Sequence, residues 1–189
     1  YRDDIPLPPA SVVKSLTALY ALAHLGPAFR FSTRLVATGP IQNGVLTGDL
    51  ILVGSGDPSL DTDHLAGLVS ELVKTGLRSV KGRFIVDGSA LPLAPQIDVE
   101  QPPHVAYNPA VSGLNLNYNR VYFGWEKGAN GYRIDMEARA LRYRPAVKMA
   151  RMQLKERGSP VYTYRDGGVW DEWTVSRSAL SKEGARWLP

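Results

Sequence analysis

The spacing of apolar side chains predicts a helix near the start of the chain, from Ala10 to about His24. Pro8 and Pro9 stop any earlier helix and suit the approach to a first turn, and Gly26-Pro27 ends the pattern. The apolar positions recur at the spacing of one helix face: Val12, Val13, Leu16, Leu19, Tyr20 and Ala23.

Between residues 34 and 87 the pattern alternates between strand and helix. Residues 34–38 are expected to form a strand, and Asn43-Gly44 predicts a hairpin turn from which residues 45–53 return as the partner strand. Residues 80–87 read as another strand. A helix is expected from Asp61 or Thr62 to Lys74, with a buried stripe of Leu65, Leu68, Val69, Leu72 and Val73.

The second half reads as mostly β, after a Pro-rich irregular stretch at residues 89–109. Asp166-Gly167-Gly168 is a further hairpin signal, and the aromatic residues are expected to serve as core and cross-strand pairs. The expected strands are residues 114–125, 132–138, 147–154, 162–164 and 169–175.

Composition narrows the possible function classes. The 189 residues suffice for one medium domain or two small ones, and 44% hydrophobic with 21% charged residues is typical of a soluble globular protein. No apolar run approaches the roughly 20 residues of a membrane span. The absence of cysteine excludes disulfides, thiolate catalysis and cysteine-based zinc sites. The three histidines show no metal-ligand spacing, so we expect no metal and no other cofactor.

The net charge of +4 arises partly from a basic region that could meet an anionic polymer. Apolar residues interleave with these charges, which favours solvated strand faces, and no nucleic-acid-binding motif is present. The basic residues concerned are Arg139, Arg142, Arg144, Lys148, Arg151, Lys155 and Arg157.

Ser11 and Lys14 carry the main chemical signal, because the predicted helix puts them on one face, one turn apart. A serine hydroxyl is a weak nucleophile until a neighbouring group takes its proton, and a neutral amine can do so. The helix N-terminus adds a positive field where negative charge develops on an attacked carbonyl. A bare Ser-x-x-Lys also arises by chance, and a serine at a helix start is usually a cap, so spacing alone favours the structural interpretation.

The flanking residues change that assessment. Several motifs in register resemble the S13 D-alanyl-D-alanine carboxypeptidases, the class C low-molecular-mass penicillin-binding proteins, up to about Val121. These motifs are Pro9-Ala10-Ser11-Val12-Val13-Lys14, Leu25-Gly26-Pro27, Arg30-Phe31-Ser32-Thr33, Gly48-Asp49-Leu50, the run from Gly54 to Leu60, the run from Gly82 to Asp87, and Tyr107-Asn108 through Asn119.

The resemblance implies an acyl-enzyme on Ser11, with Lys14 as general base and a peptidoglycan stem peptide as substrate. It implies carboxypeptidase or endopeptidase activity, acylation by β-lactams, and a periplasmic or extracellular location. Asp57 would lie in an inserted domain and receive the amino group of the peptide stem, although Asp before Pro is also a common turn residue.

The fold class implied is α+β, with a Ser-x-x-Lys helix from a β-lactamase/transpeptidase-like domain, then an inserted α/β unit and a β-rich lobe. The expected domains are residues 1–33, 34–106 and 107–189. The family also has a Ser-x-Asn and a strand-borne Lys-Thr-Gly. No Ser-x-Asn occurs here, and we expect Lys74-Thr75-Gly76 to end a helix, which makes that match a coincidence. The chain is therefore expected to be an incomplete, inactive fragment.

Two alternatives remain open at this point. One is a non-catalytic module whose basic β half grips an anionic cell-wall polymer. The other is a different Ser-x-x-Lys hydrolase, an esterase or a β-lactamase.

Overall fold

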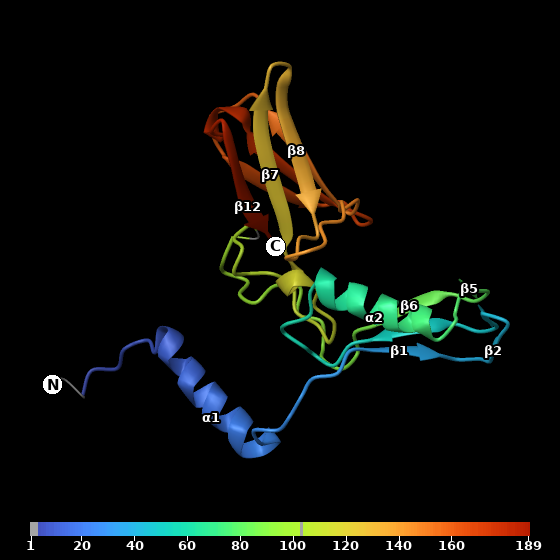
Figure 1. Cartoon of the computed structure of the whole chain (residues 1–189). Coiled ribbons are helices and arrows are strands. Elements are labelled where there is room, and N and C mark those ends of the chain that lie inside the picture. The colour runs from blue at the N-terminus through green and yellow to red at the C-terminus, as the bar shows by residue number, and fades with distance from the viewer. Residues whose placement is uncertain (1–3, 103) are drawn as a thin grey trace. The chain divides into compact units, whose positions relative to one another are not determined.

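A computed structural model describes residues 4–102 and 104–189 and divides the chain into two units, Tyr1–Phe31 and Ser32–Pro189. Helices and strands occur together, so the α+β class is confirmed at this level (Figure 1). The first predicted domain boundary falls two residues after this division, and the second, at residues 106/107, stays a prediction.

The first unit contains the predicted helix. A 3₁₀ turn at Ala10–Val12 leads directly into α1, Val13–Leu25. Gly26 ends the helix with φ +76°, a conformation that glycine adopts without strain, and its N–H bonds Leu22 O at 3.1 Å. No residue of α1 is buried, and its large apolar side chains are exposed. A 13-residue helix is only marginally stable by itself and normally depends on packing against other elements. Among the described residues, nothing buries a side chain of α1.

Two small sheets build the α/β part, defined here as residues 34–87. In one, β4 (Leu50–Val53) pairs antiparallel with β1 (Arg34–Ala37) and parallel with β6 (Phe84–Asp87). In the other, β3 (Val45–Leu46) pairs antiparallel with β2 (Ile41–Gln42) and parallel with β5 (Ser79–Val80). The core comprises Leu46, Leu50 and Leu77, with Leu35, Leu72 and Val80 packed against them.

The hairpin turn at Asn43-Gly44 is confirmed, with φ +51° and +78°, as a two-residue primed turn requires. The continuous strands expected at 45–53 and 80–87 are wrong, because each divides in two where the chain passes from one sheet to the other. Asp49 stabilises the segment in which the chain passes between the two sheets. Its carboxylate accepts hydrogen bonds from the backbone N–H and from Nη2 of Arg83, both at 2.8 Å.

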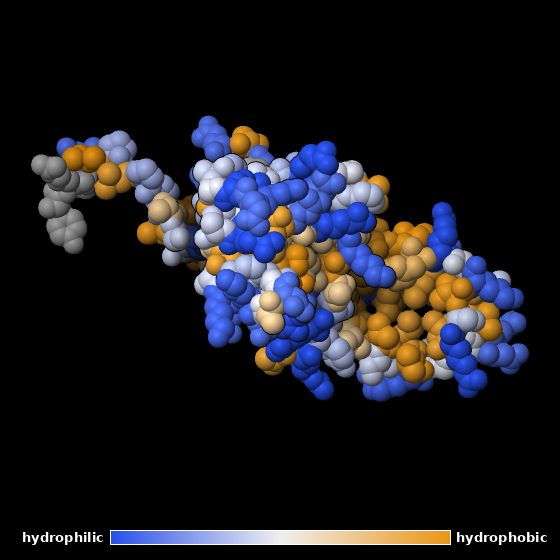
Figure 2. All heavy atoms as spheres, turned by 90° about the horizontal axis from the view of Figure 1, so that it is seen from above, coloured by the Kyte–Doolittle hydropathy of each residue, from blue (hydrophilic) through white to orange (hydrophobic). Residues whose placement is uncertain are grey.

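Helix α2 (Thr62–Lys74) has the predicted bounds, with Asp61 as N-cap and Gly76 at φ +84° after its end. The predicted buried stripe is partly wrong. Leu65, Leu68 and Leu72 are half-buried, whereas Val69 and Val73 are 54% and 62% exposed. The helix packs through the side that carries Leu72, which turns Val69 and Val73 away from the core. Figure 2 shows apolar side chains reaching the surface of the α/β part.

Two three-stranded sheets form the β lobe, defined here as residues 121–188. One sheet has the order β12-β7-β8 and the other β10-β11-β9. The core is Phe123, Met152, Trp173, Val175, Leu180 and Leu188, which confirms the expected role of the aromatic residues. The strands are β7 (Val121–Gly128), β8 (Gly131–Glu137), β9 (Ala150–Lys155), β10 (Tyr162–Asp166), β11 (Asp171–Ser176) and β12 (Glu183–Leu188).

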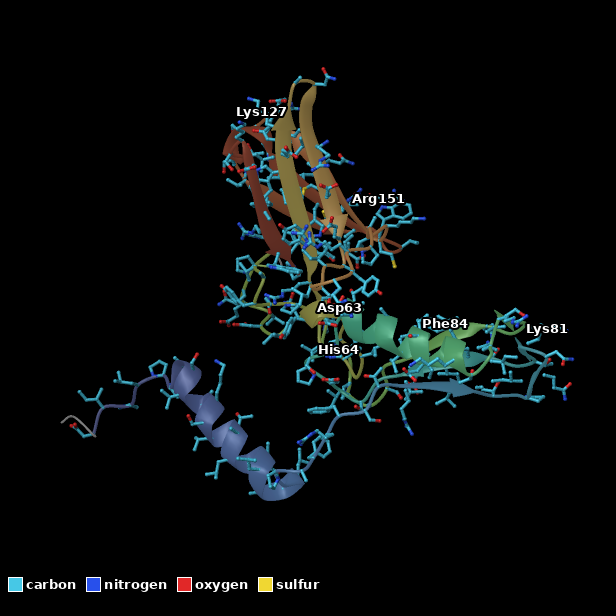
Figure 3. All side chains as sticks on the ribbon, viewed as in Figure 1. Asp63, His64, Lys81, Phe84, Lys127 and Arg151 are labelled. Atoms are coloured by element: carbon cyan, nitrogen blue, oxygen red, sulfur yellow. The ribbon has the colours of Figure 1, made fainter. Side chains whose placement is uncertain are left out.

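The α/β part and the β lobe meet at the start of α2. Thr62 Oγ1 donates to Ala138 O at 2.8 Å. The Asp63 carboxylate accepts the backbone N–H groups of Arg142 and Tyr143, each at 2.9 Å. Figure 3 shows Asp63 and His64 at this end of the helix, away from Phe84 and Lys81.

The strand predicted from residue 114 is wrong over its first half. Asn117, Tyr118 and Asn119 have φ of +52°, +60° and +50°, which is left-handed backbone that no strand contains. Asparagine tolerates this conformation, and the Asn117 side chain compensates by binding Thr62: its Oδ1 accepts from the Thr62 N–H and its Nδ2 donates to Oγ1. The strand begins only at Val121.

Candidate functional site

Ser11 and Lys14 are brought together as their spacing predicts. Lys14 Nζ donates a hydrogen bond to Ser11 Oγ at 2.8 Å, a separation across which a proton can pass. Ser11 lies in the 3₁₀ turn and Lys14 in the first turn of α1, so the pair stands at the N-terminal end of a helix. Both residues are exposed.

The residue before the serine has an unusual backbone. Ala10 has φ +44°, in the left-handed region that costs a residue with a Cβ about 1–2 kcal/mol. Such strain concentrates at functional sites, where the surrounding structure holds it in place.

Asp57 lies in the loop between β4 and α2. It belongs to the second unit, whereas Ser11 and Lys14 belong to the first, so its role beside them stays a prediction. Its Oδ1 accepts both the N–H of Ser59 at 2.9 Å and the Ser59 hydroxyl at 2.7 Å. This is the hydrogen bonding of an Asx turn, which was the competing structural interpretation. The loop is anchored by the N–H of Gly56, which donates to Gly113 O at 2.7 Å.

Lys74-Thr75-Gly76 ends a helix, as predicted. Lys74 is the last residue of α2 and pairs with Glu71 at 2.6 Å, while the Thr75 hydroxyl donates to Leu72 O at 2.7 Å. These contacts occupy both side chains in helix termination.

Sequence reasoning missed a polar network that holds the chain before β7. Asn119 Nδ2 donates to Ala110 O and to Asn115 Oδ1, both at 2.8 Å, and Asn115 in turn binds Ser112 through backbone and side chain. The signal was the repeated Asn-x-Asn spacing of residues 115–119. Its role here is to shape the loop.

Within residues 4–102 and 104–189, no three histidine, aspartate or glutamate side chains gather where they could hold a metal ion. The expectation of a site without metal or cofactor stays a prediction. Among the same residues, no helix has the length and apolarity needed to cross a membrane.

Comparison with known proteins gives consistent matches. The sequence profile of the D-Ala-D-Ala carboxypeptidase 3 (S13) family matches residues 1–159. The D-alanyl-D-alanine carboxypeptidase DacB of Haemophilus influenzae is 41% identical over 80 residues, which are 42% of this chain and 17% of that protein. The D-alanyl-D-alanine carboxypeptidase of Actinomadura sp. (strain R39) is 32% identical over 118 residues, 60% of this chain and 22% of that protein.

Solved structures agree at the level of the fold. Penicillin binding protein 4 (dacB) from Haemophilus influenzae aligns with a TM-score of 0.70 and 23% identity, over 96% of this chain and 41% of that one. The same protein complexed with a novel β-lactam aligns with a TM-score of 0.62 and 24% identity, over 95% and 39% of the two chains. The chain spans about a fifth of the length of the curated relatives and about two fifths of the length of the chains in these structures. Since the family profile covers most of its length, the chain belongs to the D-Ala-D-Ala carboxypeptidase 3 (S13) family.

Proposed function

We propose that this chain supplies the nucleophile of a serine-type D-Ala-D-Ala carboxypeptidase acting on peptidoglycan stem peptides. The observation that carries the proposal is the 2.8 Å contact between Lys14 Nζ and Ser11 Oγ at a helix start, in a chain of the S13 family. The proposal includes DD-endopeptidase activity on cross-linked stems, because the same steps would cleave either amide.

In the proposed reaction, neutral Lys14 takes the proton of Ser11 as Oγ attacks the carbonyl of the penultimate D-Ala. The N–H groups at the helix start favour the negative charge that develops on the carbonyl oxygen. The amide C–N bond then breaks, the proton passes to the leaving nitrogen, and the terminal D-Ala departs. Water attacks the resulting ester and releases Ser11. A β-lactam would follow the first steps and remain on Ser11 as a stable ester.

The domain arrangement is part of the proposal. The Ser11 helix would belong to a transpeptidase-like catalytic domain, and residues 34–106 and 107–189 would be domains inserted into it. The exposed apolar side chains of α1, among them Leu16 and Leu19, fit a helix that packs against further protein. We also propose that Asp57 meets the amino group of the stem peptide and that the protein works in the cell envelope.

The chain by itself is expected to be close to inert. Ser11 and Lys14 are exposed, whereas the neutral amine that the reaction needs is favoured by burial. The sequence also contains no Ser-x-Asn to complete the site.

The experiment is acylation by a labelled penicillin, located by intact and peptide mass spectrometry. It compares the full-length protein that carries this chain, its Ser11→Ala variant and the 189-residue chain. A stable adduct on the Ser11 peptide of the full-length protein alone is expected. A folded full-length protein without an adduct would overturn the proposal. Rapid loss of the adduct with release of hydrolysed penicillin would indicate a β-lactamase instead.

A second candidate function rests on the exposed charges of Arg142 and Arg144, which make no ion pair with any described residue. They fit a non-catalytic module that binds an anionic wall polymer. This function predicts sedimentation with purified cell walls that salt abolishes and that Ser11→Ala leaves unchanged.

A further inference from the structure

A cavity of about 550 Å³ lies within the second unit, between the segment that precedes β7 and the β10-β11-β9 sheet. This volume falls within the range of about 300–1,000 Å³ typical of small-molecule sites. Part of its wall is apolar, from Leu116, Val147 and Trp173, and its charged side chains are Arg120 and Asp171.

Arg120 has the properties of a cation without its counterion. Its Nε is buried and has no hydrogen-bond partner among the described residues. The guanidinium carbon lies 5.0 Å from the ring centre of Tyr118 and 5.5 Å from that of Trp187, so the two aromatic rings hold the group in position. A buried guanidinium donor without an acceptor is costly, and Arg120 makes no ion pair with any described residue, so its charge remains open to an incoming anion.

Asp171 supplies the opposite charge on the same cavity wall. Its Oδ1 accepts the hydroxyl of Tyr164 at 2.8 Å. Burial, and then this hydrogen bond, raise the pKa of Tyr164 to about 12, so the phenol stays a donor near neutral pH. No ion pair joins Asp171 to Arg120, although both line the cavity.

Of the four amide side chains on the wall, Asn108, Asn117 and Asn119 are already hydrogen-bonded, whereas Gln96 makes no hydrogen bond with the described residues. Asn108 exchanges two hydrogen bonds with the backbone of Asp98, and Asn117 binds Thr62. They therefore shape the cavity, while Arg120 and Asp171 remain available to a ligand.

We propose that this cavity binds a small zwitterion, a free amino acid or a dipeptide. Its carboxylate would pair with Arg120, its ammonium would approach Asp171, and its side chains would contact the apolar wall. An extended dipeptide spans about 7 Å, a length that fits within a cavity of about 550 Å³. The site does not involve Ser11 or Lys14 and is independent of the proposed acyl transfer.

The test is an NMR titration of the 189-residue chain carrying Ser11→Ala, which keeps covalent chemistry out of the result. The probes are L-Ala-L-Ala and D-Ala-D-Ala, each compared with its N-acetyl derivative and its C-terminal amide. The indole N–H of Trp173 reports on the cavity, and that of Trp170, which bonds Glu172 at 3.1 Å outside the lining, serves as reference in the chains that keep Arg151. The two enantiomers distinguish a wall-derived peptide from an ordinary one.

Arg120→Gln is expected to weaken dipeptide binding about tenfold or more, because it removes a charge-assisted hydrogen bond. The matched control is Arg151→Gln, a change at a residue of the β lobe that is labelled in Figure 3. Arg151 also stacks on an aromatic ring, with its guanidinium carbon 3.8 Å from the Trp170 ring centre, but it does not line the cavity. Capping either end of the dipeptide should weaken binding, and amidation should do so most. Dispersed spectra of the free variants establish that they fold.

Three results would overturn the proposal. One is that no dipeptide shifts the Trp173 resonance at up to about 10 mM. Another is equal affinity in wild type and Arg120→Gln. The third is that the amide and the N-acetyl derivative both bind as tightly as the zwitterion.

Discussion

Replacing Gly113 by alanine should disturb a backbone contact between the segment that precedes β7 and the residues that follow β6. A Cβ on Gly113 would lie 2.4 Å from Gly88 O and 2.9 Å from the backbone N of Ala90, where ordinary contact begins at 3.4 Å. Both neighbours are backbone atoms, which cannot turn aside as a flexible side chain can. The Gly113 N–H also donates to Gly88 O at 2.9 Å, and this bond must stretch or break.

Overpacking of this kind costs about 1–3 kcal/mol, and a strained buried hydrogen bond adds about 1 kcal/mol. The expected loss for Gly113→Ala is therefore about 2–4 kcal/mol, which lowers the melting temperature of a chain of this size by about 4–16 °C. Thermal and urea unfolding followed by far-UV circular dichroism would measure it.

The matched control is Gly67→Ala on α2, where an added Cβ meets no atom within 4 Å. Alanine is favoured over glycine inside a helix, so this variant should gain about 0.5–1 kcal/mol. The reasoning is refuted if Gly113→Ala melts at or above the wild-type temperature while Gly67→Ala gains stability as expected.

Three further predictions follow from single contacts. Asp61→Ala removes the N-cap of α2, whose Oδ1 accepts a 2.8 Å hydrogen bond from the N–H of His64, the third residue of the helix. This variant should lower the free energy of unfolding by about 1 kcal/mol in urea titrations, and an unchanged midpoint would contradict the prediction. The side-chain and backbone hydrogen bonds from Arg83 lower the pKa of Asp49 below its usual value of 3.8. These bonds therefore stabilise the folded state fully above pH 3.8, and this contribution is lost as the pH falls through the lowered pKa. Thermal melts from pH 5 to about pH 2 should thus fall more steeply for wild type than for Asp49→Asn, and parallel curves would argue against the bond. Ultraviolet titration should show a tyrosinate forming near pH 12 that is absent from Tyr164→Phe. Asp171→Asn should lower the pKa of Tyr164 only part of the way towards 10, because burial is the larger cause of the shift.

The elements that could be predicted are those whose signals are local. The bounds of α2 follow from Asp61 before it and Gly76 after it, and the hairpin turn follows from Asn43-Gly44. In each case the residues that decide the structure are neighbours in sequence.

The elements that could not be predicted depend on distant partners. Strand β12 was missed because its pairing residues in β7 are some 60 positions away, and nothing in the local alternation of Glu183–Leu188 indicates them. The strand expected from residue 114 was wrong because apolar alternation suggested a strand, whereas the side chain of Asn117 is held by Thr62, 55 residues earlier. Tertiary hydrogen bonds overrode the pattern in that segment.

The same division between local and distant signals applies to the candidate site. Ser11 and Lys14 are three residues apart, so helix geometry alone brings Oγ and Nζ to 2.8 Å, and the contact forms although α1 buries no residue. What helix geometry cannot supply is the environment that makes the amine a base, because burial and neighbouring charges come from other parts of a protein. The contact is thus necessary for the proposed chemistry and insufficient for it. Acylation of the proposed longer protein, compared with the chain by itself, would therefore measure the contribution of the environment rather than that of the Ser11–Lys14 pair.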